Sequence, residues 1–271
     1  MNPRLSIIIV NFNGGEHLQR CLASLAAHPS QASTEVIVVD NASTDGSDAH
    51  ATQFAGVRLV KLRENVGFSA GNNAGIRASS GELLVLLNND TVVGSGALDA
   101  LIARLEARPE AGVAGPRLVD GGGRTELSFG PMISPLGELR QKVVLALHNR
   151  RFGPVTRWVE RTTRREQFVD WVSGACLLVR RRVAEDAGLL DERFFLYTED
   201  VDFCASVRAR GWKVLFSPAA EIVHLRGRSR ATAVQQSNAA YRRSHLAFYQ
   251  KHHPRMVPVL RAYLRLKGER P

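Results

Sequence analysis

Long apolar runs are absent from this 271-residue sequence, and no segment approaches the roughly 20 consecutive apolar residues that a membrane-spanning helix needs. The chain also enters its first apolar stretch without a signal-peptide pattern. These two absences argue against an integral membrane protein and predict a cytoplasmic location. Hydrophobic residues still make up 44% of the sequence, enough to build a sizeable core and to exclude general disorder.

Cysteine is scarce, with only Cys21, Cys176 and Cys204, and their spacing matches no metal or redox motif. A disulfide scaffold is therefore excluded, and we expect three reduced core residues.

Acidic residues are outnumbered, 26 against 36 basic ones, which gives a net charge of +10. Such an excess suits a polyanion, an anionic membrane surface or a phosphorylated substrate, although a coding preference for Arg would also produce it. The charge concentrates in Arg140–Arg182 and Arg226–Arg270. No interleaved aromatic-basic face and no known reader motif supports a nucleic-acid partner.

The first half of the chain alternates strand and helix patterns. Continuous apolar strands between short helices predict an α/β fold with a mostly parallel central sheet and helices on both faces. The predicted strands are Leu5–Val10, Val36–Val39, Val57–Leu62 and the run from Leu83, and the helices are Glu16–Ala27, Ser47–Phe54 and Asn72–Ser79.

The second half is less regular. It contains a basic segment, Leu136–Glu166, whose periodicity is too weak to assign a secondary structure. We expect one domain over residues 1–232 and a basic helical extension over residues 233–271. Predicted elements are strands at Phe168–Val179, Lys213–Ser217 and Glu221–His224, and helices at Arg181–Ala187, Val201–Arg210 and Ser237–His252.

Three successive strands of the first half end on polar side chains. These are Asn11 and Asn13, then Asp40 and Asn41, then the run Asn88–Asp90. One such ending is ordinary turn chemistry. Three at the same edge of a parallel sheet predict a binding crevice, because ligands bind beyond the carboxyl ends of such strands.

Two groups of residues could carry chemistry. Asp90 offers the oxygen ligand that Mg²⁺ or Mn²⁺ prefers, and His224 precedes a basic, hydroxyl-bearing loop that contains Arg228 and Ser229. Asp90 alone would more simply cap a turn, and a lone His is usually structural.

The second group consists of Glu199, Asp200 and Asp202, which follow an aromatic cluster at a helix start. A helix dipole favours acids there, but crowded acids near apolar walls also give a raised pKa that suits a general base. The spacing leaves both readings open.

Several motifs occur together in a recognisable order: SIIIVNFN, VIVVDNASTDGS, LRENVGFSAGNNAG, LLNNDT, WVSGACLLVRR, FFLYTEDVDFCASVRARGW and HLRGRS. Over roughly Leu5 to Arg230 the sequence resembles the family 2 glycosyltransferases of the GT-A fold, and is most similar to the bacterial rhamnosyltransferase-like group. The resemblance implies an inverting transfer of a sugar from dTDP-rhamnose or a UDP-sugar to a hydroxyl of a saccharide or lipid-linked saccharide, in cell-surface polysaccharide synthesis.

The resemblance also implies roles for individual positions. Asp200 would be the catalytic base beside Glu199, and Asp90 and His224 would hold a divalent metal ion. Two usual metal-motif carboxylates are Asn here, which predicts weak or lost metal dependence. The implied donor-binding residues are Val10, Asn11, Asn13, Asp40, Asn65, Gly67, Asn73, Asn88, Asn89 and Asp90, and Arg228 and Ser229 would neutralise the diphosphate.

Acceptor contacts are predicted at Trp171, by stacking on a sugar ring, and at Asp202; a core role for Trp171 is an equal alternative. The segment Tyr241–Lys267 mixes basic and apolar residues, which predicts peripheral binding at the inner face of the plasma membrane, or simply a solvated helix.

Two alternative functions remain. One is a catalytically weak or inactive nucleotide-sugar-binding relative, prompted by Asn88 and Asn89. The other is a sugar nucleotidyltransferase, which is disfavoured because the loop Asn11–Glu16 carries no cation for a triphosphate.

Overall fold

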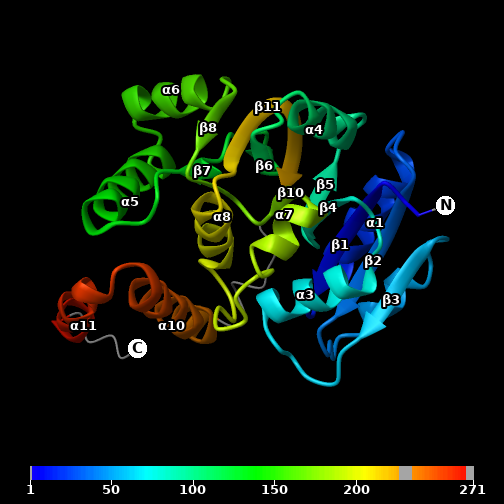
Figure 1. Ribbon diagram of the computed structural model, residues 1–271, viewed down its shortest axis with the longest axis horizontal. Coiled ribbons are helices and arrows are strands. Elements are labelled where there is room, and N and C mark those ends of the chain that lie inside the picture. Colours follow the sequence, from blue (N-terminus) through cyan, green and yellow to red (C-terminus); the bar gives the residue numbers. More distant parts are fainter. Residues whose placement is uncertain (1, 226–233, 267–271) are drawn as a thin grey trace.

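A computed structural model describes residues 2–225 and 234–266. Within these residues a nine-stranded sheet has the order β3-β2-β1-β4-β10-β6-β11-β5, with β8 paired to β11. Figure 1 shows the sheet with helices on both sides. The strands are β1 (Leu5–Asn11), β2 (Thr34–Asp40), β3 (Val57–Lys61), β4 (Leu83–Asn88), β5 (Thr91–Val93), β6 (Ala111–Val119), β7 (Phe129–Gly130), β8 (Gln167–Val169), β9 (Trp171–Val172), β10 (Cys176–Arg180) and β11 (Lys213–His224). The helices are α1 (Gly15–Ala27), α2 (Asp48–Ala51), α3 (Phe68–Ala78), α4 (Ala97–Glu106), α5 (Pro135–Asn149), α6 (Gly153–Thr162), α7 (Arg181–Asp186), α8 (Glu199–Ala209), α10 (Val234–His252) and α11 (Val257–Leu266), with a 3-10 turn, η1, at Pro254–Met256.

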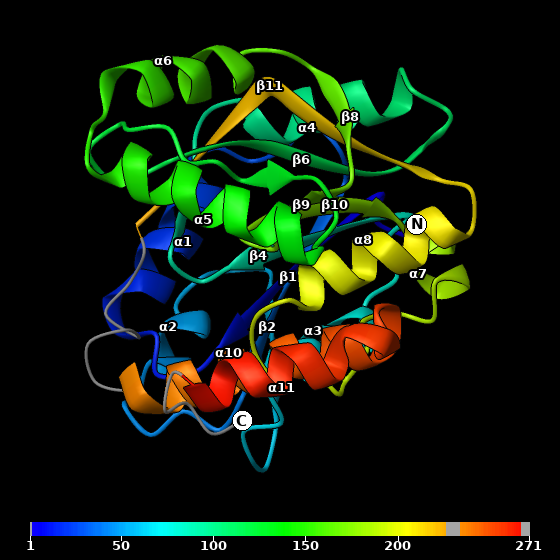
Figure 2. The same cartoon turned by 90° about the vertical axis from the view of Figure 1, so that its left-hand side faces the viewer.

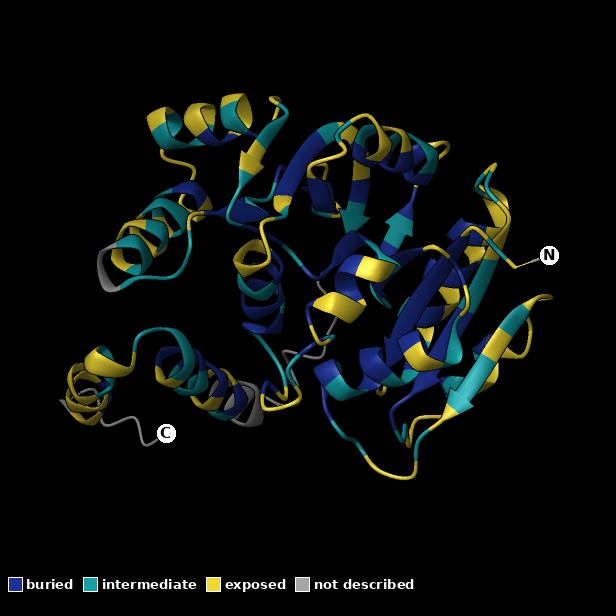
Figure 3. Cartoon of the chain, in the orientation of Figure 1, coloured by how far each residue is buried: buried dark blue, intermediate teal, exposed yellow. Residues whose placement is uncertain are grey.

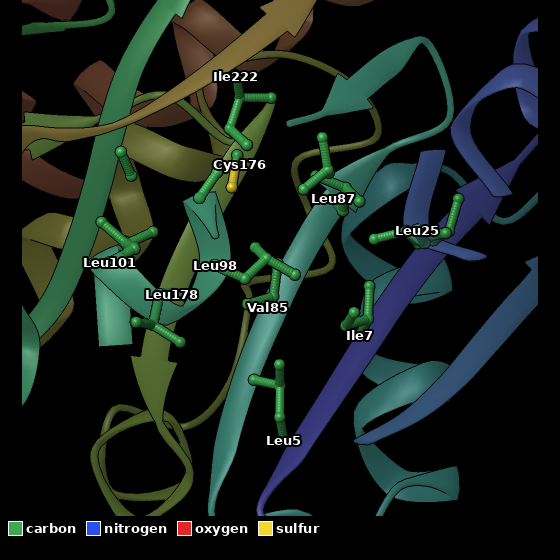
Figure 4. Close-up of a cluster of buried hydrophobic side chains, with 14 of the residues drawn as sticks. Leu5, Ile7, Leu25, Val85, Leu87, Leu98, Leu101, Cys176, Leu178 and Ile222 are labelled. Atoms are coloured by element: carbon green, nitrogen blue, oxygen red, sulfur yellow. The ribbon is translucent and has the colours of Figure 1, made fainter. Parts of the chain in front are cut away.

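Strands β3, β2, β1 and β4 run parallel, which confirms the α/β class predicted from the sequence. Successive side chains of a strand point to opposite faces, so a strand covered on both sides must be apolar throughout. Ile7 and Ile9 accordingly pack toward α1 and α4, whereas Ile8 packs toward α3 on the other face. Figure 4 shows the first of these clusters, in which Ile7, Val85 and Leu87 lie together.

The second half of the sheet is mixed, because β10 runs antiparallel to both β4 and β6. The single strand predicted at Phe168–Val179 is wrong: it divides into β8, β9 and β10, with Ser173 and Gly174 in the break before β10. The two short strands predicted around Pro218 are instead one strand, β11, with a register shift between Ser217 and Glu221. Pro cannot donate to the ladder, so the strand bends there and continues.

Several helix bounds also differ from the sequence predictions. Helix α3 begins at Phe68 and α8 at Glu199, earlier than predicted, whereas α2 covers only Asp48–Ala51. The basic segment that the sequence left unplaced forms two helices, α5 and α6. The predicted buried, reduced state of the cysteines is confirmed, since all three are buried and free.

Helix α10 packs onto the α8 side of the molecule. Phe248 and Tyr249 belong to the same buried cluster as Phe203 of α8, and Leu260 of α11 joins them. The turned view of Figure 2 shows α10 and α11 below α8, and Figure 3 shows the alternation of buried and exposed positions along them. The boundary predicted between residues 232 and 233 remains a prediction.

None of the helices in the described ranges has the length and apolar character needed to cross a bilayer.

Candidate active site

The tips of the parallel strands meet at one edge, as the sequence predicts. In the sheet register Asn11 lies beside Asp40, and Val10 beside Asn88. The apolar bodies of these strands are buried on both faces, so their last residues are held rigidly.

Asn11 is the centre of a buried hydrogen-bond network at this edge. Its Nδ2 donates to Asp40 Oδ1 at 3.2 Å and to Ser47 Oγ at 2.9 Å, and its Oδ1 accepts from Asn89 Nδ2 at 2.9 Å. Asp40 Oδ2 also accepts the Ser43 N–H. Such a satisfied network joins the tips of β1, β2 and β4 into one unit.

Two other residues that were predicted to bind the sugar nucleotide make hydrogen bonds to neighbouring loops. Asn13 Oδ1 accepts the Thr44 N–H at 2.8 Å, and Asn13 itself has a positive φ. Asn65 Oδ1 accepts from Asn41 Nδ2 and from the Gly67 N–H.

Gly67 and Asn73 connect this edge to the loop before α8. A Cβ on Gly67 would lie 2.6 Å from the carbonyl oxygen of Phe195, so only glycine fits this contact. Asn73 donates to the Leu190 carbonyl and to Glu192. Their direct role toward a donor remains a prediction.

A pocket of about 470 Å³ opens beside the β1 and β4 tips. It brings together eight residues predicted from the sequence: Val10, Asn88, Asn89, Asp90, Trp171, Glu199, Asp200 and His224. Asn11, Asn13, Asp40, Asn65, Gly67, Asn73 and Asp202 do not line it.

His224 lies between two carboxylates on one wall of the pocket. Its Nε2 is 3.4 Å from Asp90 Oδ1, and its Nδ1 is 3.3 Å from Glu126 Oε2. Burial disfavours the charged imidazolium, but hydrogen bonds and charges from Asp90 and Glu126 outweigh it and raise the pKa of His224 to about 9.

Glu199 and Asp200 line the same pocket from the first turn of α8. Burial raises the pKa of Asp200. The N–H groups of Gly174 and Val201 donate hydrogen bonds to its carboxylate, at 2.9 Å and 2.8 Å, and lower the pKa in part. Burial, followed by the charge of Asp200, raises the pKa of Glu199 well above its usual value. Glu199 Oε2 is buried without a hydrogen-bond partner in the described structure. Asp200 is therefore the group that loses its proton first.

The two residues before Glu199 carry unusual backbone conformations. Tyr197 and Thr198 both have a φ of 69°, and Tyr197 lines the pocket. Positive φ is rare for bulky side chains, and such conformations cluster at functional sites.

Asp202 faces away from the pocket, toward α10. Its carboxylate pairs with Lys251 at 2.8 Å and with His252 at 2.6 Å, and it is buried. This geometry favours a structural role and disfavours the acceptor contact predicted from the sequence.

The sequence profile described as "Glycosyltransferase like family 2" matches residues 3–243. The chain belongs to this family. It is therefore an enzyme of the hexosyltransferase class, as the motifs predicted.

Individual relatives agree with this assignment. N-acetylglucosaminyl-diphospho-decaprenol L-rhamnosyltransferase of Mycobacterium tuberculosis is 32% identical, over 93% of this chain and 86% of that protein. The O-antigen biosynthesis protein RfbC of Myxococcus xanthus is 30% identical, over 89% of this chain but 19% of its own length. Both support the predicted rhamnosyltransferase-like group.

Among solved structures, the mannosyltransferase PcManGT from Pyrobaculum calidifontis, in complex with GDP-Man and Mn²⁺, superposes with a TM-score of 0.63 at 19% identity. The match covers 97% of this chain and 69% of that chain. The GT-A fold predicted from the sequence is confirmed.

In this family 2 glycosyltransferase the side chains around Asp90 could supply part of the ligands of a divalent cation, and oxygen atoms of the substrate would supply the remaining ligands. No group of three or more His, Cys, Asp or Glu side chains in the described residues could hold a metal by itself. Asn88 Oδ1 is buried without a partner in that same part of the chain and lines the same pocket as Asp90 and His224. Mg²⁺ and Mn²⁺ are commonly bound by few protein ligands plus phosphates.

Trp171 lines the glycosyltransferase pocket but is largely buried. Its Nε1 donates to the Pro131 carbonyl at 2.9 Å, and Gly130 lies against its ring. This arrangement fixes the indole, and the predicted stacking on an acceptor sugar remains a prediction. Arg228 and Ser229 lie outside the described residues.

Ten pocket residues were not predicted from the sequence, among them the aromatic and polar residues Phe12, Glu126, Ser173 and Tyr197. Phe12 had a detectable signal, since it is an aromatic residue at a strand tip between two candidate asparagines. Glu126 had none, because its position beside His224 depends on a fold contact across 98 residues.

Proposed function

We propose that this glycosyltransferase transfers a sugar, with inversion, from a nucleotide-diphosphate sugar to a hydroxyl of a saccharide or lipid-linked saccharide. The observation that supports the proposal is the pocket itself, which is lined by the buried carboxylate of Asp200 and by Asp90 and His224, the residues predicted to bind the metal. Single-displacement sugar transfer needs a base on one side of the sugar and charge stabilisation on the other.

Asp200 would accept the proton of the attacking hydroxyl. The N–H groups of Gly174 and Val201 hold its carboxylate in place, and protonated Glu199 leaves the negative charge of the pair on Asp200. Attack from this side displaces the diphosphate from the opposite face of the sugar and so inverts the anomeric centre.

The tip of β4 would hold the donor. Asn88 and Asn89 offer neutral hydrogen bonds to ribose or diphosphate, and Asp90 and His224 would hold Mg²⁺ or Mn²⁺. A bound divalent cation would offset the charge developing on the leaving diphosphate. The structural neighbour that contains Mn²⁺ supports this choice. Because Asn88 and Asn89 are neutral, we expect the cation to bind weakly until the nucleotide is bound.

The names of the relatives guide the choice of substrates. They support transfer of a sugar such as rhamnose to a saccharide or lipid-linked acceptor, and a place in cell-surface polysaccharide synthesis. We infer dTDP-rhamnose or a UDP-sugar as the donor. Trp171 and the nearby pocket wall would contact the acceptor. We place the protein in the cytoplasm, at the inner face of the plasma membrane.

The test is a panel of dTDP- and UDP-sugars with candidate acceptors, scored by nucleotide release and by the anomeric configuration of the product, with and without Mn²⁺. Asp200→Asn serves as the matched control, because it keeps the shape of the side chain and removes the base. A product with retained configuration would overturn the mechanism.

A catalytically weak, donor-binding family member is the second candidate, favoured by Asn88 and Asn89 in place of carboxylates. Such a protein would bind nucleotide in calorimetry. In the donor panel it would form free nucleotide from the sugar donor no faster than Asp200→Asn does.

A further inference from the structure

The helical hairpin formed by α5 and α6, residues 135–165, exposes large apolar side chains. Leu139 is 62% exposed, Val143 49%, Phe152 50% and Trp158 41%. Leu139 and Val143 are four residues apart and share one face of α5. An exposed apolar pair on one helix face, with two exposed aromatic residues on and next to the adjoining helix, marks a candidate interaction surface.

The same hairpin is strongly basic. Residues 139–165 contain eight Arg and Lys and one Glu, a net charge of +7. All seven arginines of this segment lack a side-chain ion pair in the described structure: Arg140, Arg150, Arg151, Arg157, Arg161, Arg164 and Arg165. By contrast, Arg104 and Arg108 of the neighbouring α4 region both pair with Glu166. The hairpin therefore presents uncompensated positive charge to solvent.

The hairpin also adjoins the active site. A cleft of about 370 Å³ lies between α5 and α6 and ends at Phe129 and Gly130, and Leu127 lines both this cleft and the catalytic pocket. Trp158 and Arg140 line the cleft. A surface that binds this hairpin would therefore lie next to the pocket that contains Asp200.

The C-terminal helices are less suited to such a role. Phe248, Tyr249, Leu260 and Leu264 are buried in the core, and the exposed large side chains of these helices are Tyr241, Val259 and Tyr263. Lys251 is paired with Asp191 and Asp202. Figure 1 shows both helix pairs at the left end of the molecule, away from β3, so α11 could assist but offers less free apolar surface.

We propose that the α5–α6 hairpin is a docking surface for an anionic lipid bilayer, with Phe152 and Trp158 entering the headgroup region and the arginines contacting lipid phosphates. Basic helices with aromatic and aliphatic residues bind at bilayer interfaces in this way. The inference does not depend on the proposed sugar transfer. Exposed Leu139 and Val143 favour lipid over nucleic acid, because aliphatic side chains gain little from a phosphate backbone.

The experiment measures binding of the full chain to phosphatidylglycerol and to phosphatidylcholine vesicles by co-sedimentation at low salt, without donor or acceptor. The test variant combines Arg157→Glu, Arg161→Glu and Arg165→Glu. The matched control combines Arg20→Glu, Arg58→Glu and Arg63→Glu, which changes the net charge equally at the β3 end of the molecule. We expect the test variant to lose about 100-fold in partitioning, since each charge near anionic lipid contributes, and the control to stay within a few-fold of the parent.

Insertion has a separate readout. Brominated phosphatidylglycerol should quench tryptophan fluorescence in the parent, and most of this quenching should disappear in Trp158→Phe. Trp171 is buried in the core, and Trp212, which is partly buried and lies outside the hairpin, is covered by the guanidinium of Arg182. This variant keeps the charges and replaces one aromatic ring with another, so it is a test that does not rely on the triple reversal folding.

Three outcomes would overturn the proposal. They are no binding to anionic vesicles at low salt, equal losses in the test and control variants, and binding to RNA that exceeds vesicle binding and is unchanged in Phe152→Ser. Loss of binding on reversal of Arg261 and Arg265 in α11, with the hairpin variant unaffected, would likewise assign the role to the C-terminal helices.

Discussion

The sheet edge beside the pocket and the α8 side of the pocket contain buried polar groups in opposite states. At the β1 and β2 tips, Asn11 and Asp40 are buried, and their oxygen and nitrogen atoms are engaged in a mutual network. At the start of α8, Glu199 Oε2 is buried without a partner in the described residues, and burial raises the pKa of both Glu199 and Asp200.

This difference suggests that the hydrogen-bonded residues hold the sheet edge in position, whereas the acids of α8 take part in the reaction. A satisfied network stabilises one arrangement, because breaking any bond leaves a buried group unpaired. A pair of buried, crowded acids is unfavourable in the fold and persists where its altered proton affinity is useful. We therefore expect substitutions on the α8 side to change rate, and substitutions in satisfied clusters to change stability.

The largest expected effect is that of Asp200→Asn. Removing the base should lower the transfer rate about 10²–10⁴-fold, while donor binding stays near that of the parent. The measurement is single-turnover sugar transfer together with calorimetry of nucleotide binding. Transfer at the parental rate would mean that Asp200 is not the base.

The same carboxyl gives a pH dependence of defined sign. Its pKa in the fold is raised above 3.8, and only the ionised form accepts a proton, so transfer should fall as pH drops through that raised pKa. Ionising Asp200 is unfavourable in the fold, so Asp200→Asn should be at least as stable as the parent at neutral pH. Denaturant unfolding checks this, and a clear loss of stability would contradict it.

Asp202→Asn should show the reverse behaviour, although the residue lies only two positions away. Its carboxylate holds Lys251 and His252 against α8, and both partners are about one-quarter exposed. Losing the pair should lower the free energy of unfolding by about 2–3 kcal/mol, less than for a fully buried pair. Transfer by the folded protein should change less than about threefold, and a rate loss like that of Asp200→Asn would restore Asp202 to the site.

These two aspartates show how far sequence reasoning reached. The alternation of strands, the polar tips and the acid cluster followed from local patterns, and the parallel sheet edge then brought Val10, Asn88 and Asp90 together. The local pattern did not show which acid faces the pocket, and only the family resemblance implied Asp200. The orientation of Asp202 depends on the docking of α10 about 50 residues later. Glu126 was missed for the same reason. The hairpin at 135–165 was missed because its apolar residues do not all face a core.

Asp90→Ala tests metal and nucleotide binding near the end of β4, and its expected effect is of intermediate size. It removes the one carboxylate of the β4 tip, so nucleotide diphosphate should no longer tighten Mn²⁺ binding, and donor affinity should fall by about tenfold. Calorimetry with Mn²⁺ alone, nucleotide alone and both together measures the coupling. The comparison variant is Asn89→Ala, which removes a neutral side chain that donates to Asn11; it should weaken nucleotide binding but leave the coupling between metal and nucleotide in place. Equal coupling in Asp90→Ala and the parent would make the strand tip a capped turn.

Among the residues that line the pocket, Glu199→Gln has the smallest expected effect on transfer, and it tests the comparison most directly. Because burial and the charge of Asp200 raise the pKa of Glu199 well above its usual value, this side chain should carry a proton at neutral pH. Glutamine has nearly the shape of that protonated acid and no charge, so transfer should change by less than about fivefold.

Glu199→Ala is the matched control, since it removes the side chain and leaves a cavity beside Asp200. It should cost about 2–3 kcal/mol of stability and a larger share of the rate. The pH profile of transfer, measured for both variants, distinguishes the charge from the packing. If Glu199→Gln loses as much rate as Asp200→Asn, the ionised form of Glu199 takes part in the reaction, and the two acids share the role of base.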